Sequence, residues 1–453
     1  MTLFSLIFLA AFLSAFMWIS VKDIKNGIYA VVFLLPAYLL RFNFFNIPTT
    51  ALEMMIYILF ALWLFGNRNN SDISRGIKEF YKKDKLLSWG IAFLFIGVIL
   101  STINSIDLRT SLGILKGWFV DPFLFFLVFI SAIKNKKQIA IALWSFILSG
   151  FVVALVSLGY ALTNSLTFDG RLRAIYESPN YLAMYLAPAF LFAVYLFIFQ
   201  RGPSLSFRAD VRNPSIETNH CNTCLSVVKG FFSSLLSAQN DKKWQAVVLL
   251  VVLSAIFLAK SYGAMLGIAV ALFCFLLKKY QSKNAYFFLD NKKRLIIVSA
   301  IALVIFSFLS YQKYKQIINS NERSSFHSRL MIWDASREML KDSPVFGIGP
   351  GTFQEIYLDY QNRFSVPYLE WAVAEPHNTF LAFYLQSGLI GFVGFLLILF
   401  WMLKRARYND MIFVFLIYFL IHGFVDTLYW KNDLAMIFWL VIAVGYIIED
   451  HNV

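Results

Sequence analysis

The chain has 453 residues, of which 59% are hydrophobic and 15% are charged, and its mean hydropathy is +0.66. Soluble domains are roughly half apolar and a quarter charged, so this composition excludes an ordinary soluble fold and favours a membrane protein. The net charge of +14 is expected to reflect membrane topology and lipid contact, not nucleic-acid binding. Three cysteines exclude a disulfide framework.

Long apolar runs recur from the first residue to the last, and each predicts a transmembrane helix because a helix needs about 20 apolar residues to cross a bilayer. The first run lacks a basic leader and a cleavage site, so we expect it to be retained. The sequence therefore predicts an all-α, polytopic protein with about 12 to 13 transmembrane helices in a single domain, 1–453. The predicted spans are 3–21, 27–40, 50–66, 86–103, 117–133, 138–163, 180–199, 245–259, 262–277, 294–310, 378–403, 411–425 and 433–448.

The second of these spans is the weakest prediction. It is short and contains Pro36, so it is expected to be a short or re-entrant segment. Orientation follows from lysine and arginine, which stay on the cytoplasmic side when they lie in short loops. The basic loops 67–85, 134–137, 201–243, 278–294 and 404–410 all fall on one side if every span is real. That places segments 164–179 and 311–376 outside.

The outer segment 311–376 is predicted to be an ordered cap. Ser324 or Ser325 is suited to cap a helix over 329–340, and Pro344 with the glycines after it ends that helix. One helix face is predicted to be cationic and the other to pack, namely Arg329, Trp333 and Arg337 against Ile332, Ala335 and Met339.

The cytoplasmic segment 201–243 is rich in Ser, Asn, Pro and Arg, and we expect a disordered insertion. It contains His220 next to the pair Cys221 and Cys224. A zinc site needs a fourth ligand that the segment does not offer, so no metal is expected.

Basic residues in the outer segments are candidates for phosphate binding. Arg171 and Arg173 lie just before the span that opens at Asn180, and a guanidinium group offers a planar fork that matches two phosphate oxygens. Contact with lipid headgroups is the alternative for both residues. Arg329 in the cap is a candidate for phosphate binding for the same reason, and a solvated helix face is the alternative for it.

His377 begins a span directly after the long outer segment. Its ordinary pKa near 6.5 suits proton transfer, although a helix-start residue satisfied by Asn378 or backbone is the alternative. The pair His377 and Asn378 is followed after nine residues by Gly388, then by Gly391 and Gly394.

Here the sequence resembles the O-antigen ligase and O-antigen polymerase superfamily, whose signature is His-Asn, nine residues, then Gly-x-x-Gly. Further pieces occur in the family's order: Gly170-Arg171-Leu172, Pro179-Asn180, Ser328-Arg329, Pro344 with Gly347, Gly349 and Gly351, His422 to Asp426, and Lys431 to Leu434. The ligase region would span 171–394. The chain has Ser261-Tyr262-Gly263-Ala264 where the family often has Ser-Arg-Gly-Ala, so Lys260 is the residue that could replace that arginine.

The resemblance implies a GT-C-type glycosyltransferase with a helical periplasmic loop, in the bacterial cytoplasmic membrane. It would move a glycan from an undecaprenyl diphosphate carrier to an acceptor hydroxyl on the outer face, with no metal or cofactor. The predicted catalytic residues are His377 as general base with Arg171 and Arg329 on the diphosphate. The residues predicted to bind substrate are Arg173, Arg337, Asn378, Lys260, Asp426 and Lys431. For the group at 426–433, an ion pair that locks the helix ends together is the alternative.

Two kinds of alternative remain open. A lipid-linked glycan flippase or another transporter would also be a basic, many-helix protein, and Asp121 with Pro122 is the best candidate for a polar site within a span. Within the enzyme class, ligase, polymerase and protein O-oligosaccharyltransferase share the motif, so the acceptor is a glycan, a lipid or a protein. The acceptor is expected to meet the aromatic loop 353–375, with Tyr357, Tyr360, Phe364, Tyr368 and Trp371.

Overall fold

The computed structural model describes residues 3–44, 47–66, 79–199, 242–280, 311, 325–361, 363 and 373–448. Over these residues the predicted all-α membrane fold is confirmed. Seven helices are long and apolar enough to cross a membrane, and five shorter apolar helices accompany them. Each overlaps one of the predicted spans. The predicted span 294–310 lies outside the described residues, as do almost all of the insertion 201–243 and its two cysteines.

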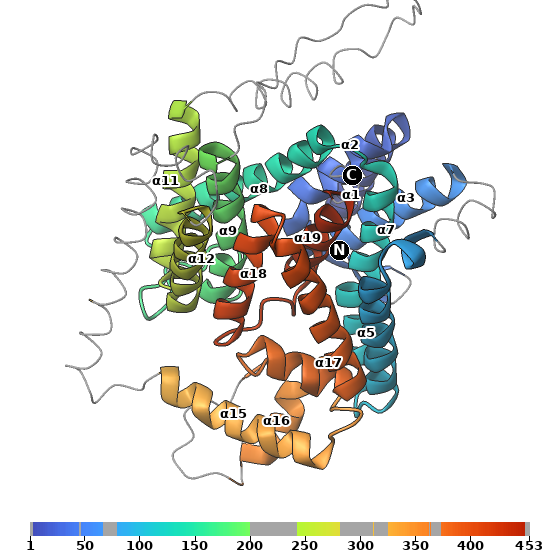
Figure 1. Ribbon diagram of the computed structural model, residues 1–453, viewed down its shortest axis with the longest axis vertical. Coiled ribbons are helices and arrows are strands. Elements are labelled where there is room, and N and C mark those ends of the chain that lie inside the picture. The colour runs from blue at the N-terminus through green and yellow to red at the C-terminus, as the bar shows by residue number, and fades with distance from the viewer. Residues whose placement is uncertain are drawn as a thin grey trace, which may run out of the picture.

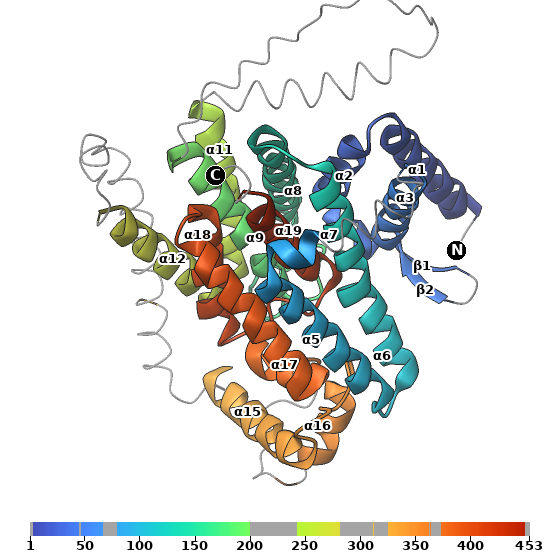
Figure 2. The same cartoon turned by 45° about the vertical axis from the view of Figure 1, so that its right-hand side comes forward.

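The N-terminal part forms one side of the bundle (Figure 1). It consists of α1 (Leu3–Lys22), α2 (Ile24–Phe33), the 3-10 helix η1 (Leu35–Leu39), the strands β1 (Arg41–Phe44) and β2 (Ile47–Thr50), and α3 (Ala51–Gly66). The predicted weak span is thus a short helix that ends before Pro36 and continues as a 3-10 turn. The two strands pair antiparallel, with Arg41 opposite Thr50, and this hairpin was not predicted. Figure 2 shows it at the edge of the bundle.

The remaining helices build the bundle and a cap. They are α5 (Lys85–Ile103), α6 (Leu108–Ile114), the π-helix η2 (Leu115–Val120), α7 (Asp121–Ala132), α8 (Lys136–Leu162), α9 (Pro179–Val194), the π-helix η3 (Tyr195–Phe199), α11 (Lys242–Ala259), α12 (Tyr262–Tyr280), α15 (Ser325–Asp342), α16 (Phe353–Gln361), α17 (Thr379–Ala406), α18 (Asp410–Gly423) and α19 (Asn432–Ile448). Almost every residue of α19 is buried, so this helix forms the centre of the bundle.

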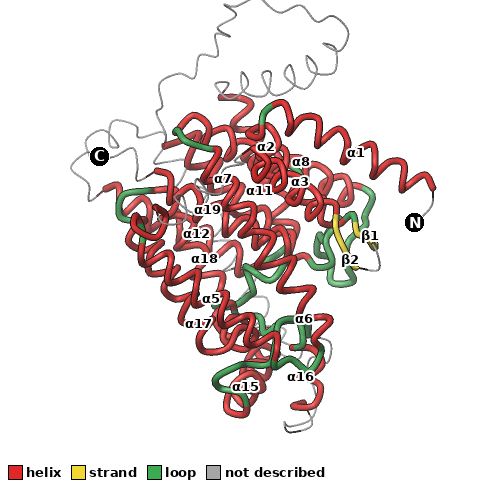
Figure 3. Tube along the Cα trace, turned by 90° about the vertical axis from the view of Figure 1, so that its right-hand side faces the viewer, coloured by secondary structure: helices red, strands yellow, loops and turns green. Residues whose placement is uncertain are grey.

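The cap consists of α15 and α16 and lies beyond one end of the bundle in all three views (Figures 1, 2 and 3). It has its own apolar core, which joins α15 and α16 to the first part of α17. The face of α15 that was predicted to pack is buried, with Ile332, Ala335 and Met339 each at most 1% exposed. The described part of the segment 311–376 is therefore a helical cap with a packed core.

Helix α17 is broken at Gly388, and the break holds the cap in place. Gly388 has φ +67° and ψ −178°, a conformation that an L side chain rarely adopts. The loop after α15 lies in the gap: the Ile348 N–H donates to the Leu385 carbonyl at 2.7 Å, and the Leu389 N–H donates to the Val345 carbonyl at 2.9 Å. Backbone groups that the break would leave unpaired are thus satisfied by the cap loop.

The far end of α17 lies among basic residues. Lys278 of α12 donates to the Ala406 carbonyl at 2.7 Å and pairs with Asp410 at 3.0 Å. Arg405 and Trp401 both donate to Asp84 at the start of α5. The basic ends of these helices therefore lie at one end of the bundle, and the cap lies at the other.

Candidate active site

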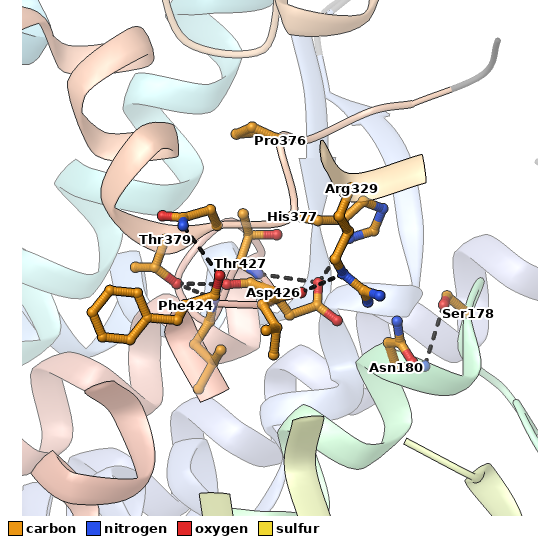
Figure 4. Close-up of polar contacts among 12 residues, drawn as sticks. Ser178, Asn180, Arg329, Pro376, His377, Thr379, Phe424, Asp426 and Thr427 are labelled. Atoms are coloured by element: carbon orange, nitrogen blue, oxygen red, sulfur yellow. Dashed lines mark hydrogen bonds and ion pairs between the residues drawn. The ribbon is translucent and has the colours of Figure 1, made fainter. Parts of the chain in front are cut away.

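His377 and Asp426 form the centre of a polar cluster beneath the cap. The His377 Nδ1 lies 3.0 Å from Asp426 Oδ1, and the dashed lines in Figure 4 mark the contacts around it. The histidine side chain is 36% exposed and the aspartate side chain 4%. One ring nitrogen is thus held by a buried carboxylate, while the ring remains open to solvent.

The loop that carries Asp426 fixes the position of this carboxylate. Thr379 Oγ1 donates to the Asp426 carbonyl at 2.9 Å, and the Thr427 N–H donates to Asp426 Oδ1 at 3.1 Å. Burial opposes ionisation, but hydrogen bonding and charge from His377 outweigh it and lower the Asp426 pKa to about 2. An ionised Asp426 can only accept, so we infer that Nδ1 of His377 carries the proton and leaves Nε2 as the basic atom.

The start of α17 determines where His377 stands. Asn378 caps the helix, because its side-chain oxygen accepts the N–H groups of Phe380 and Leu381 at 2.9 and 3.1 Å. Its amide group donates to the Phe424 carbonyl at 3.1 Å. Asn378, predicted to bind substrate, is therefore placed as the anchor that ties His377 to the Asp426 loop.

Three segments of the site turn through non-glycine residues with positive φ. His377 has φ +47°, Ala174 in the Arg171 loop has φ +50°, and Lys260 between α11 and α12 has φ +49°. Each such residue costs about 1–2 kcal/mol, and residues of this kind gather at functional sites where the surroundings hold them.

The cap contributes Arg329 to the cluster from the first turns of α15. Its Nε donates to the Val425 carbonyl at 2.8 Å, directly before Asp426. Figure 4 shows the Arg329 guanidinium beside His377 and above Asn180. One turn further along α15, Trp333 Nε1 donates to the Pro376 carbonyl at 3.0 Å, so the same helix face holds the segment that leads into His377.

Arg171 reaches the cluster from the loop between α8 and α9. Its Nε donates to the Ala259 carbonyl at 3.0 Å and its Nη2 to Asn180 Oδ1 at 2.5 Å. Burial lowers the Arg171 pKa from its ordinary value, and the Arg329 charge lowers it further while Asp169 and Asp426 raise it. Two arginines and the Asp426 carboxylate thus lie within electrostatic range of one another.

Lys431 is a buried cation at this end of the bundle, whereas Arg171 and Arg329 are half-buried. Its Nζ lies 2.8 Å from Glu177 Oε2 and 3.8 Å from the centre of the Tyr181 ring. Glu177 also accepts from Arg41 of β1 at 3.3 Å. The sequence did not single out Glu177 or Tyr181, although both lie in the segment around Pro179 and Asn180 that carries the family pattern.

The other predicted residues differ in their placement. A Cβ on Gly170 would lie 3.5 Å from the Lys260 Nζ, so Lys260 lies against the Arg171 loop. Arg173 is exposed, two residues after Arg171. Arg337 is exposed and pairs with Asp334 of the same helix at 2.8 Å, two turns away from Arg329. The structure therefore brings Lys260 to the cluster but places Arg337 on the outer face of the cap.

Part of the aromatic loop differs from the prediction. Residues 353–361 form α16, and Phe353 and Tyr357 stack with ring centres 5.7 Å apart inside the cap core. Tyr360 is also buried and donates to Asp342. These two tyrosines support the cap rather than line a sugar site, because a helix puts them on its packed face. Phe364, Tyr368 and Trp371 lie outside the described residues.

Glu375 connects the cap to α17 next to His377. Its Oε2 accepts from Gln386 Nε2 at 2.6 Å, and Gln386 Oε1 accepts from the Gly351 N–H at 2.7 Å. Burial raises the Glu375 pKa to about 8. Neutral pH therefore favours the protonated acid, which is stable without a cationic partner. Within the described residues, no group of three or more His, Cys, Asp or Glu side chains could hold a metal.

Residues 246–396 match the model of a family described as O-antigen ligase. The matched region runs from α11 through the cap to the middle of α17, and it contains Arg329, His377 and Gly388. No curated protein matches the chain.

Proposed function

We propose that the chain is a member of the O-antigen ligase and O-antigen polymerase superfamily and transfers a glycan from undecaprenyl diphosphate to an acceptor hydroxyl, and the match of residues 246–396 to the O-antigen ligase family supports this. The reaction is that of a membrane glycosyltransferase with a GT-C-type architecture. The observation that carries the proposal is the His377–Asp426 contact at 3.0 Å, with Arg171 and Arg329 beside it.

The chemistry follows from these groups. Nε2 of His377 takes the proton of the acceptor hydroxyl while the oxygen bonds to the anomeric carbon of the glycan. The bond from that carbon to the diphosphate oxygen breaks, and the diphosphate leaves with the electron pair. Arg171 and Arg329 stabilise the negative charge that develops on the diphosphate, because guanidinium groups stay positively charged at any accessible pH. We propose that no divalent ion is required.

The proposed orientation places this site on the outer face of the cytoplasmic membrane. Lys278, Lys279, Lys404 and Arg405 lie at the end of the bundle opposite His377. Lysine and arginine in short loops favour the cytoplasmic side, so the cap faces outward. Lipid carriers that have crossed the membrane present their glycans on that side.

The test supplies the purified full chain with a lipid-diphosphate glycan, a chelator and candidate acceptors, and identifies the acceptor that gains mass. Transfer by the wild type, and its loss in His377→Ala and Arg329→Ala, is the expected result. Lys341→Ala is the matched control on α15, because Lys341 is exposed and pairs only with nearby Glu338 in the described cap. Whether the acceptor is a glycan, a lipid or a protein separates polymerase, ligase and protein glycosylation.

A transporter is the competing outcome of the same experiment. If no acceptor gains mass while labelled lipid-diphosphate glycan crosses reconstituted vesicles, the enzyme proposal is overturned. Glycan transfer that survives His377→Ala would remove this residue from the mechanism.

A further inference from the structure

We propose that Glu177 and Lys431 are positioning residues, whose ion pair sets the distance between the arginine loop and the His377–Asp426 pair. The segment 163–178 is called the arginine loop. The segment 424–431, which carries Asp426, is called the histidine loop. The proposal rests on the function proposed above, and it assigns the pair a role in catalysis without contact to the reacting atoms.

The burial of the two partners is strongly asymmetric. The Lys431 side chain is 8% exposed, whereas the Glu177 side chain is 59% exposed. A buried ammonium group is costly unless it is paired, so Lys431 holds the carboxylate rather than the reverse. The Tyr181 ring beneath it, 3.8 Å from Nζ, adds a second reason for the charge to stay in place.

The ion pair joins the loop between α8 and α9 to the loop between α18 and α19. Glu177 follows Arg171 in the loop between α8 and α9 and precedes Asn180, which binds the Arg171 guanidinium at 2.5 Å. Lys431 follows Asp426 in the loop between α18 and α19, five residues later. The contact at 2.8 Å therefore links the loop that carries a diphosphate-binding arginine to the loop that carries the histidine's partner.

The loop on the Lys431 side is rigid. Thr379 Oγ1 contacts both the Asp426 carbonyl and the Leu428 N–H, and Tyr429 donates to the Trp118 carbonyl at 2.6 Å. The arginine loop instead carries the exposed Glu177 near its end, and Lys431 binds the carboxylate of this residue. Hydrogen bonding to Lys431 is the largest cause that lowers the Glu177 pKa, so the carboxylate stays charged at pH values below its ordinary pKa. Loss of this contact releases the Glu177 end of the arginine loop, whose middle stays bound through the Leu172 N–H to the Leu258 carbonyl at 2.9 Å, while the histidine loop keeps its place.

A geometric role predicts a specific kinetic result. In Glu177→Gln, kcat should fall about 10-fold with little change in the acceptor KM, because misplaced groups slow the reaction without removing an acceptor contact. Glu177→Lys and Lys431→Glu should each lose more, because each places two like charges at the contact. Glu338→Gln at the exposed Lys341–Glu338 pair of α15, 2.7 Å apart, is the matched control and should leave kcat unchanged.

A distance measurement tests the proposal independently of activity. Spin labels at exposed Phe168 of the arginine loop and exposed Leu389 of α17 should give a narrow distance distribution in the wild type. The distribution should broaden in Glu177→Gln and stay narrow in Glu338→Gln. Because Glu177→Gln leaves the buried Lys431 without its counter-ion, the unfolding midpoint and the yield of monodisperse protein are measured beside the distances, so that a folding defect is told apart from a displaced loop.

The two measurements separate failure of this inference from failure of the proposed function. If the wild type transfers glycan, and Glu177→Gln matches it in kcat and in distance distribution, the positioning role is overturned. If the wild type transfers nothing, the proposed function fails, and a broadened distribution in Glu177→Gln would still support the link between the loops. An unchanged distribution would overturn that link as well.

Discussion

Gly97 of α5 and Gly391 of α17 meet backbone to backbone, and a Cβ on Gly97 would overlap the nitrogen and Cα of Gly391. Three residues further along, Gly394 lies in the same way against the backbone of Leu94. Close helix contact through small residues is a common way to pack helices in membranes. Two of the glycines after the histidine therefore hold α17 against α5, and Gly388 allows the break.

The first prediction concerns this contact. Gly97→Ala should destabilise the protein by about 1–3 kcal/mol, because the added methyl group has no room and the helices must separate. Gly113→Ala in α6 is the control, since a Cβ there meets nothing within 4 Å. Thermal unfolding in detergent should show a lower midpoint for Gly97→Ala and an unchanged or higher midpoint for Gly113→Ala. Equal midpoints for both variants would contradict the packing role.

The second prediction concerns Asp426. Asp426→Asn should lower kcat roughly 10- to 100-fold, because a neutral amide stabilises neither the proton on Nδ1 nor the charged ring. The amount of folded protein should change little, since the amide can keep the hydrogen bond from the Thr427 N–H. Steady-state transfer rates measured beside the yield of monodisperse protein test this. A variant that folds and keeps the wild-type rate would remove Asp426 from the mechanism.

Arg171 offers a test of geometry at constant charge. Arg171→Lys should lower the transfer rate by about 10²-fold or more, because a lysine cannot bind both the Ala259 carbonyl and Asn180 while facing a diphosphate. Arg407→Lys at the exposed far end of α17 is the matched control and should behave as the wild type. The measurement is the rate at saturating and limiting donor. Similar rates for both lysine variants would show that charge alone suffices.

Glu375 makes stability depend on pH. Burial raises its pKa from 4.5 to about 8, so the folded state keeps a proton that the unfolded state releases. Its contribution is fully present below pH 4.5 and is lost as the pH rises to about 8, at roughly 1.4 kcal/mol per pH unit. Glu375→Gln should remove this slope, whereas Glu338→Gln on the exposed face of α15 should retain it. Unfolding midpoints between pH 5 and 9 measure both, and equal slopes in the two variants would argue against a buried acid.

The sequence predicted most helices because apolar length is a direct signal of a membrane span. It also predicted the packed face of α15, since a period of 3.6 residues places Ile332, Ala335 and Met339 together. The hairpin at 41–50 was missed because its strands are only four residues each, too short for alternation to show. The helix at Phe353–Gln361 was missed because its aromatic residues were interpreted as a sugar-binding loop.

Contacts between distant segments were beyond sequence reasoning. Glu177 and Lys431 are 254 residues apart, and nothing near either residue predicts the partner. The break at Gly388 is equally hidden, because an apolar run gives the same signal whether the helix is continuous or not. His377, Arg171 and Arg329 could be predicted as candidates from their motif. Their arrangement around Asp426 depends on how the Arg171 loop, the cap and the α18–α19 loop meet in three dimensions.

The break in α17 also divides the helix into two parts that differ in how well they tolerate substitutions. Beyond Gly388, the helix is constrained by backbone contact with α5, where a Cβ on Gly97 would lie 2.0 Å from the Gly391 nitrogen. Around Gly388, the helix meets the cap through backbone hydrogen bonds to Val345 and Ile348. These bonds do not depend on which side chains stand at those two positions. Substitutions on the cap loop should therefore be tolerated better than substitutions at the contact between α5 and α17.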